Sequence, residues 1–170
     1  DRIGMHDEAT GFARLASHPN PTVSVVQGAA VAGGCELALH CDIRIGSPAA
    51  AFAMPLARLG LVAPCYAAER LENTIGLAAT REMLLTGERI DAARAREIGL
   101  VSRVVAPSAL LPTAEQIAER ISQNGEEVLA MTTDAGNTYL SRAMIITAGH
   151  GAFEPRRLRH SYTSLSMLAW

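Results

Sequence analysis

The sequence is poor in aromatic residues and contains no long apolar run. Phe, Tyr and Trp make up only 4% of the 170 residues, whereas all hydrophobic residues together make up 49%. The core is therefore expected to be aliphatic and rich in alanine. No apolar stretch approaches the roughly 20 residues that a membrane-spanning helix needs, and the polar start at Asp1-Arg2 does not resemble a signal peptide. We expect one globular domain in the cytoplasm.

Cysteine is scarce as well. The three cysteines are Cys35, Cys41 and Cys65, an odd number without a Cys-x-x-Cys or Cys/His spacing. The usual sequence patterns of a disulfide framework or a zinc site are thus missing. We expect reduced, mostly buried thiols.

The charge balance excludes a further class of protein. The formal net charge is −2, and no basic stripe occurs in the first 150 residues, which argues against a nucleic-acid-binding surface. The local exception is a basic cluster near the C-terminus, made of Arg156, Arg157, Arg159 and His160.

The predicted elements change from mixed α/β to all-α along the chain. A β-branched run predicts a strand over 22–27, and an apolar helix begins at Gly33. Strand, helix and strand in so few residues predict a βαβ-type unit with tight connections. The predicted helices are 5–17 (interrupted at Gly11), 33–41, 65–75, 77–85, 92–98, 109–123, 126–147 and 153–170, and the predicted strands are 22–27, 43–45, 51–53 and 101–105.

A turn of small residues at 28–34 joins the first strand to this helix. Small residues let a backbone approach a ligand closely, and the first N–H groups of a helix have no partner inside it. Such groups stabilise negative charge that develops on an oxygen, for example on the enolate of a thioester. The alternative is that the glycines only allow helix and strand to pack closely. The turn contains neither a Walker phosphate loop nor a Gly-x-Gly-x-x-Gly motif.

The motifs around this turn resemble the signature of the crotonase (enoyl-CoA hydratase/isomerase) superfamily. The resemblance covers about half of the chain densely and the helical remainder loosely, with several linked motifs in the right order. The matching segments are Pro21-Thr22-Val23, Gly28, Ala32-Gly33-Gly34-Cys35-Glu36-Leu37-Ala38-Leu39, Cys41-Asp42, Phe52, Pro55, Leu59-Gly60-Leu61, Arg70-Leu71, Gly76, residues 79–87, Ile90-Asp91-Ala92, Gly99-Leu100-Val101 and Val104-Val105.

The resemblance implies a fold class and an assembly. The fold is the α/β crotonase (ClpP/crotonase-like) spiral core of ββα units with an all-helical C-terminal region. Residues 1–107 would form the core, without the family's N-terminal strands, and residues 108–170 the helical oligomerisation region. A homotrimer or a dimer of trimers is implied, with residues 158–170 facing a partner. For the basic cluster, contact with the phosphates of coenzyme A and a solvated helix face both remain open.

The resemblance also implies roles for individual residues. Gly33 corresponds to a backbone N–H donor to the thioester oxygen, and Glu36 to an acid/base carboxylate. The family's other donor lies in an upstream motif of the Ala-Phe-Ser-Ala-Gly-x-Asp kind, which this sequence does not contain. For Glu36 the alternative is a carboxylate that only complements the helix dipole. The residues expected to contact the substrate are Ala32, Gly34, Leu56, Leu59 and Tyr66.

The main departure from the family's pattern is Leu56. The hydratases carry their second carboxylate at this position, and leucine can neither transfer a proton nor orient a water molecule. The aspartate of an isomerase branch is also absent from residues 63–66. Tyr66 is either a hydrogen-bond donor in the pocket or an aromatic cover of the core. His40, one helical turn after Glu36, either tunes that carboxylate or is structural.

The sequence therefore predicts an enoyl-CoA hydratase/isomerase family enzyme, a lyase or isomerase that acts on an acyl-CoA thioester. An oxyanion hole that includes Gly33 would stabilise the enolate, with Glu36 as acid/base. Because of Leu56, other crotonase chemistry (an isomerase, decarboxylase or thioester hydrolase) or a catalytically silent acyl-CoA-binding protein remains an alternative. The resemblance implies no metal or cofactor besides the coenzyme A of the substrate, and we expect no nucleic-acid or membrane partner.

Overall fold

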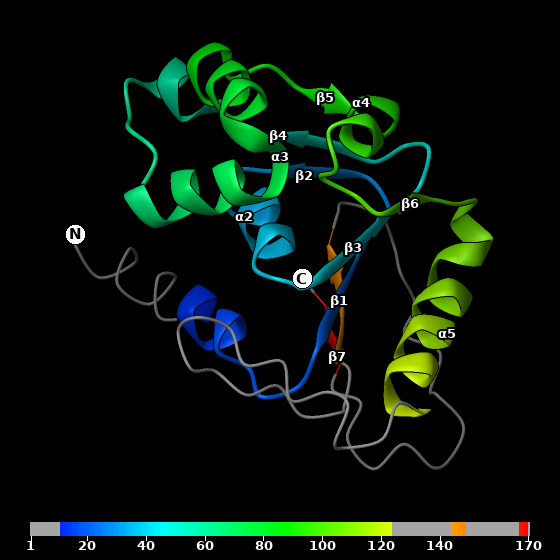
Figure 1. The fold of residues 1–170 in the computed structure, drawn as a ribbon. Coiled ribbons are helices and arrows are strands. Elements are labelled where there is room, and N and C mark those ends of the chain that lie inside the picture. The colour runs from blue at the N-terminus through cyan, green and yellow to red at the C-terminus, as the bar shows by residue number, and fades with distance from the viewer. Residues whose placement is uncertain (1–10, 124–143, 149–166, 170) are drawn as a thin grey trace.

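Two β-sheets organise the chain (Figure 1). The computed structural model describes residues 11–123 and the backbone of residues 144–148 and 167–169. The larger sheet is parallel and has the strand order β6-β3-β1-β7-β8. Its strands are β1 (Thr22–Val26), β3 (Ile43–Gly46), β6 (Arg103–Val104), β7 (Met144–Ala148) and β8 (Met167–Ala169).

The predicted βαβ unit is confirmed. β1 and β3 are parallel neighbours with Val23 opposite Ile43, and the chain passes through α2 (Gly33–Leu39) between them. Every residue of β1 is buried, as expected for a β-branched run in the middle of a parallel sheet.

The smaller sheet contains two strands that the sequence did not predict. β2 (Ala29–Val31) lies inside the stretch predicted as a turn, and β5 (Ile90–Asp91) directly precedes a helix. β2 pairs parallel with the predicted β4 (Ala51–Ala53), and β4 pairs antiparallel with β5. Both unpredicted strands are too short to show an alternating pattern, so only their pairing reveals them. The strand predicted over 101–105 is real but shorter, since β6 covers two residues of it.

The C-terminal helices predicted over 126–147 and 153–170 are wrong where the structure describes this region. β7 and β8 are strands, and β7 pairs with β1 so that Thr22 lies opposite Met144. The β-branched run Ile145-Ile146-Thr147 favours a strand, and it completes the second edge of β1. The rest of both predicted helices, the basic cluster at 156–160 and residues 5–10 of the first helix lie outside the described residues; residues 11–16 are helical.

The remaining helices follow the predictions. The helices predicted over 65–75 and 77–85 form α3 (Cys65–Thr86), which is interrupted at Gly76 by φ 77° and ψ 163°. At the start of α4 (Ala92–Glu97), the predicted cap Asp91 accepts a hydrogen bond of 2.8 Å from the N–H of Arg94. α5 (Leu110–Gln123) directly follows the 3₁₀ turn η2 (Pro107–Ala109). A second 3₁₀ turn, η1 (Pro55–Leu59), precedes α3. In the described part of the chain no helix is long and apolar enough to cross a membrane.

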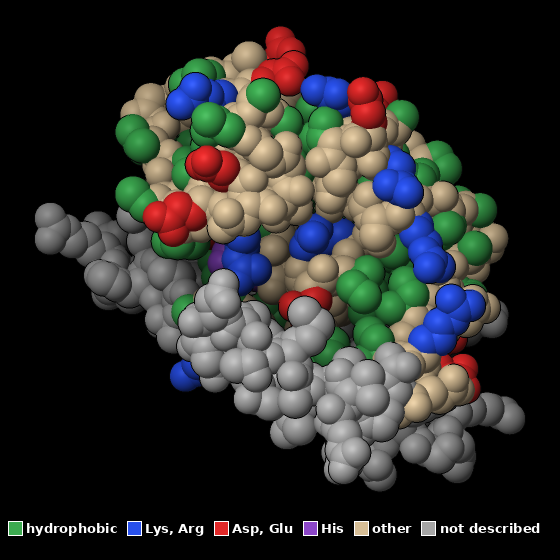
Figure 2. Space-filling view, in the orientation of Figure 1, with side chains coloured by type: hydrophobic (Ala, Val, Ile, Leu, Met, Phe, Trp, Pro, Cys, Tyr) green, Lys and Arg blue, Asp and Glu red, His purple; other side chains and the backbone are tan. Residues whose placement is uncertain are grey.

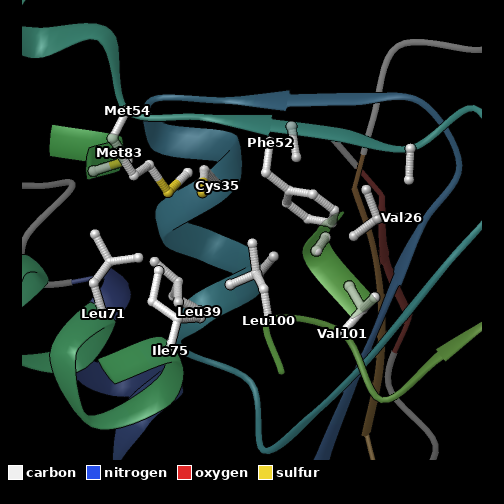
Figure 3. Close-up of a cluster of buried hydrophobic side chains, with 14 of the residues drawn as sticks. Val26, Cys35, Leu39, Phe52, Met54, Leu71, Ile75, Met83, Leu100 and Val101 are labelled. Atoms are coloured by element: carbon white, nitrogen blue, oxygen red, sulfur yellow. The ribbon is translucent and has the colours of Figure 1, made fainter. Parts of the chain in front are cut away.

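Two hydrophobic clusters hold these layers together. α5 covers one side of β1 and β3 through Val23, Val25, Ile45 and Leu110. The larger cluster surrounds α2, and Figure 3 shows Cys35 and Leu39 of this helix among side chains from the small sheet and α3. Its other labelled members are Val26, Phe52, Met54, Leu71, Ile75, Met83, Leu100 and Val101. α2 is therefore fixed by packing on several sides.

Candidate active site

The segments that carry the candidate residues leave the small sheet at the same end. Val31 of β2 lies opposite Ala53 of β4, and the two strands run parallel. α2 begins shortly after Val31, and η1, which contains Leu56, begins shortly after Ala53. The N–H of Ala32 donates a hydrogen bond of 2.9 Å to the carbonyl of Ala53. This bond ties the turn before α2 to the segment that leads into η1.

The backbone of Ala32 is strained. Its φ is 50° and its ψ is −115°, and it is the only non-glycine residue with positive φ among the described residues. Such a conformation costs on the order of 1–3 kcal/mol and persists only where the surroundings impose it. Its carbonyl accepts the N–H of Glu36 at 2.9 Å. The strained residue therefore turns the chain directly from β2 into the first turn of α2.

Gly33 and Gly34 face open space. A Cβ atom built on either residue meets no described atom within 4 Å, and neither has a positive φ. Close packing inside this chain therefore does not require glycine at either position. Of the two sequence-based interpretations, the one in which the glycines serve helix–strand packing is not supported, whereas room for a ligand at the backbone is.

Glu36 lies one turn into α2 and is buried, with 8% of its surface exposed. Its neighbour Cys35 is fully buried, and burial, followed by the charge of Glu36, raises the pKa of this thiol to about 12. Cys35 is thus an inert packing residue. The carboxylate of Glu36 is therefore the candidate acid/base group, in the same helix as the two open glycines.

The expected substrate contacts differ in their surroundings. Leu56 is half-buried in η1 and packs against the larger hydrophobic cluster. Leu59, at the end of η1, is 70% exposed. Tyr66 stands in the first turn of α3 with 43% of its surface exposed, and its ring lies edge-on to His40. Tyr66 thus contacts His40 at the end of α2, whereas Leu59 lies on the surface.

Leu59 is one of several large hydrophobic residues that are exposed. In Figure 2 hydrophobic side chains reach the surface over the upper left part of the molecule, where Figure 1 places η1 and α3. The large exposed hydrophobic residues are Leu59, Leu61, Val62, Tyr66, Leu77 and Leu85. Basic and acidic side chains are interspersed on this face.

His40 is buried at the end of α2. Its Nδ1 lies 2.8 Å from the backbone carbonyl of Glu36 and donates a hydrogen bond to it. The ring stacks on Phe12, with centroids 5.2 Å apart. Burial lowers the pKa of His40 and the positive charge of Arg70 adds to this, whereas the hydrogen bond to Glu36 acts in the opposite direction. The hydrogen bond from the His40 ring to Glu36 therefore goes to the backbone carbonyl of Glu36.

Sequence reasoning missed the surroundings of the last turn of α2. Phe12 comes from the N-terminal helix, and Arg70 of α3 donates a hydrogen bond of 3.2 Å to the carbonyl of Leu39. The match of Arg70-Leu71 to the family pattern was a signal for Arg70; no local pattern could have pointed to Phe12. In the described ranges, no group of three or more His, Cys, Asp and Glu residues is arranged to hold a metal ion.

This combination of a strained strand-to-helix turn, open glycines and a buried glutamate can be compared with known proteins. A family model described as enoyl-CoA hydratase/isomerase matches residues 5–153. The chain belongs to the enoyl-CoA hydratase/isomerase family.

The names of curated relatives agree with this family. "Probable enoyl-CoA hydratase echA8" of Mycobacterium leprae is 39% identical over 155 residues, which are 91% of this chain and 59% of that protein. The short-chain-enoyl-CoA hydratase of Clostridium acetobutylicum is 37% identical over 74% of this chain and 48% of that protein. The chain thus spans about half to three fifths of the length of these curated relatives.

The predicted crotonase fold class is confirmed by likeness to solved structures. One of them, described as a putative enoyl CoA hydratase/isomerase (crotonase) from Legionella pneumophila, has a TM-score of 0.68 and 33% identity, covering 73% of this chain and 48% of that structure. ThnE from S. clavuligerus has a TM-score of 0.67 and 31% identity, covering 73% of this chain and 61% of that structure. An enoyl-CoA hydratase from Mycobacterium smegmatis has a TM-score of 0.63 and 33% identity, covering 68% of this chain and 45% of that structure.

Proposed function

We propose that the protein acts on an acyl-CoA thioester and stabilises its enolate at the N–H of Gly33, with Glu36 as the acid/base residue. The observation that carries this proposal is the open space at Gly33 and Gly34, at the head of the helix in which Glu36 is buried. A thioester carbonyl can approach the backbone there without meeting a side chain. The names of the relatives support the substrate class.

In the proposed step, the carboxylate of Glu36 removes a proton from the α carbon, next to the thioester carbonyl, of a β,γ-unsaturated acyl group. The electrons of the broken C–H bond form a C=C bond, and the π electrons of the carbonyl move to its oxygen. The N–H of Gly33 donates a hydrogen bond to that oxygen, together with a donor that does not come from α2. Losing one such donor costs about 3–4 kcal/mol of barrier in other enzymes. Return of the proton at the γ carbon completes an isomerisation, and these two steps require no metal or redox group.

The apolar side chain of Leu56 is the reason to propose other reactions ahead of hydration. Adding water to a double bond is shared by two carboxylates, one to activate the water and one to deliver the proton. Leu56 supplies neither, because it is an apolar side chain that packs against the core. A reaction that needs a single carboxylate, such as isomerisation, decarboxylation or thioester hydrolysis, is therefore proposed ahead of hydration. The same feature favours the second candidate, a catalytically silent acyl-CoA-binding protein.

The test uses the protein in its natural length with a panel of acyl-CoA thioesters. Wild-type protein, Glu36→Gln and the control Glu69→Gln, at an exposed position of α3, are compared for turnover and for binding of the unreactive butyryl-CoA. We expect Glu36→Gln to lose turnover and keep binding, while the control behaves as wild type. Hydration of crotonyl-CoA at ordinary hydratase rates contradicts the role of Leu56, and unchanged turnover in Glu36→Gln contradicts that of Glu36. Binding without any turnover identifies the silent protein.

We also propose that the protein forms a homotrimer or a pair of trimers. Light scattering of the purified protein measures the molar mass, and a monomer contradicts this assembly.

A further inference from the structure

The end of α2 is joined to α3 and to the N-terminal helix by one aromatic cluster, made of Phe12, His40 and Tyr66. The imidazole of His40 stacks on Phe12 with an interplanar angle of 21°. Tyr66 approaches the same imidazole at an angle of 63°, with ring centroids 6.2 Å apart. His40 is the shared member of both contacts, so it links three helical segments that are distant in the sequence.

The orientation of the imidazole is set by the backbone of Glu36. The Nδ1 of His40 donates to the carbonyl of Glu36 at 2.8 Å, and the backbone N–H of His40 donates to the same carbonyl at 3.1 Å. A carbonyl only accepts, so the proton of the ring resides on Nδ1. Burial and the nearby Arg70 lower the pKa of His40 and so favour this neutral form. The ring cannot turn without breaking its bond to Glu36.

Tyr66 lies against this ring at the surface of the molecule. The side chain is 43% exposed, whereas His40 is only 6% exposed. The tyrosine therefore contacts a fixed, buried ring on one side while much of its surface faces outward. An edge-on ring pair within 7 Å has a preferred geometry. The exposed part of Tyr66 is thus available to a ligand, at a place determined from α2.

We propose that His40 is a positioning residue, which holds Tyr66 against the helix that carries Glu36 so that the tyrosine forms a wall of the acyl-thioester site. This inference rests on the proposed function for its ligand. It assigns His40 a task different from tuning the Glu36 carboxylate, because the contact runs through the imidazole ring to Tyr66.

Two substitutions separate the ring of His40 from its hydrogen bond. His40→Phe keeps an aromatic ring for Tyr66 but loses the donor to Glu36, and His40→Asn keeps a donor but loses the ring. Affinity for butyryl-CoA is measured by calorimetry for both variants, alone and combined with Tyr66→Ala. The control combination pairs His40→Asn with Leu85→Ala, because Leu85 lies on the far half of α3 and is 75% exposed.

We expect His40→Asn to weaken binding at least fivefold and His40→Phe to weaken it less than twofold. In the Tyr66→Ala background both variants should bind equally, whereas Leu85→Ala should combine additively with His40→Asn. If His40 acted only through its hydrogen bond to the Glu36 carbonyl, the order would be reversed, and His40→Phe would bind more weakly than His40→Asn. That order, or additivity with Tyr66→Ala, overturns the proposal.

A second measurement does not depend on a ligand. In protein labelled with ¹³C in the tyrosine rings, the Tyr66 signal is assigned from Tyr66→Phe and compared between the variants. We expect it to move in His40→Asn and to follow the protonation of His40 in the wild type. A Tyr66 signal that does neither overturns the role of His40. If the signal behaves as expected but wild-type protein does not bind butyryl-CoA, the proposed function fails and the His40–Tyr66 contact stands.

Discussion

Asp42 and Thr22 join the end of α2 to the start of β1 by reciprocal hydrogen bonds. The carboxylate of Asp42 accepts from the backbone N–H of Thr22 at 2.6 Å and from its hydroxyl at 2.7 Å. In return, the N–H of Asp42 donates to the hydroxyl oxygen of Thr22 at 2.9 Å. The turn that leads from α2 into β3 is thereby attached to the strand beside β3.

Replacing Asp42 by alanine should therefore destabilise the fold. The N–H and hydroxyl of Thr22 would lose their acceptor, and we expect the free energy of unfolding to fall by about 1–2 kcal/mol. Urea denaturation followed by circular dichroism measures this change. Asp42→Asn keeps one side-chain oxygen as an acceptor and should recover part of the loss. A midpoint for Asp42→Ala equal to that of the wild type would show that the pair adds nothing.

Two glycines with positive φ provide a matched comparison of strain and crowding. Gly87 ends α3 with φ 60°, and a Cβ there would lie 3.1 Å from the Cα of Pro55 and 3.2 Å from the Cγ of Arg58; Gly60 has φ 70° and open space around it. Gly60→Ala should cost about 1 kcal/mol for the left-handed backbone alone. Gly87→Ala should cost about 2–3 kcal/mol, because it also displaces η1. Thermal unfolding measures both, and equal losses would contradict crowding at Gly87.

The three thiols should differ in their reactivity. Burial raises the pKa of Cys35 and of Cys41 to about 12, whereas Cys65 is exposed at the start of α3. At pH 8 about one in 10,000 of the buried thiols is ionised, and the thiolate is the reactive form. Iodoacetamide should therefore label native protein once, at Cys65, and denatured protein three times. Cys65→Ser should remain unlabelled while native. Mass spectrometry after a short incubation counts the labels, and rapid modification of Cys35 would disprove its burial.

The protonation of His40 should make stability depend on pH. Its pKa in the folded protein is lowered by burial and by Arg70, so the unfolded chain binds the proton more tightly. The contribution of His40 is fully present above its unfolded pKa near 6.5 and is lost as the pH falls below it. Among the described residues, Tyr66 on α3 and Glu36 on the same helix also contact it. Because carboxylates also titrate at low pH, the measured quantity is the difference between wild type and His40→Phe from pH 5 to 8. The wild type should lose stability relative to the variant toward pH 5; a constant difference would contradict the prediction.

Local patterns were sufficient to predict the centre of the fold and the head of the site. β1, α2 and the cap at Asp91 follow from β-branched residues, glycines and a side-chain acceptor that lie close together in the sequence. The positions of Gly33 and Glu36 at the start of α2 were predicted in the same way. Their roles in a reaction stay predictions.

The parts that could not be predicted depend on partners far along the chain. β2 is a strand only because it pairs with β4, and the positive φ of Ala32 is imposed by the turn between β2 and α2. The contacts of His40 bring Phe12 and Tyr66 from separate segments. The wrong helix at β7 has another cause: the β-branched residues at 145–147 favour a strand locally, at the end of a longer stretch predicted to be helical.

The bend at Gly76 divides α3 into two arms with different neighbours. The first arm brings Tyr66 and Arg70 onto α2, and the second receives Arg58 of η1 at the carbonyl of Thr86. Because φ 77° and ψ 163° are accessible to glycine almost alone, the joint is set by one residue. A substitution at Gly76 would therefore change how the arm that carries Tyr66 sits relative to the arm that contacts η1.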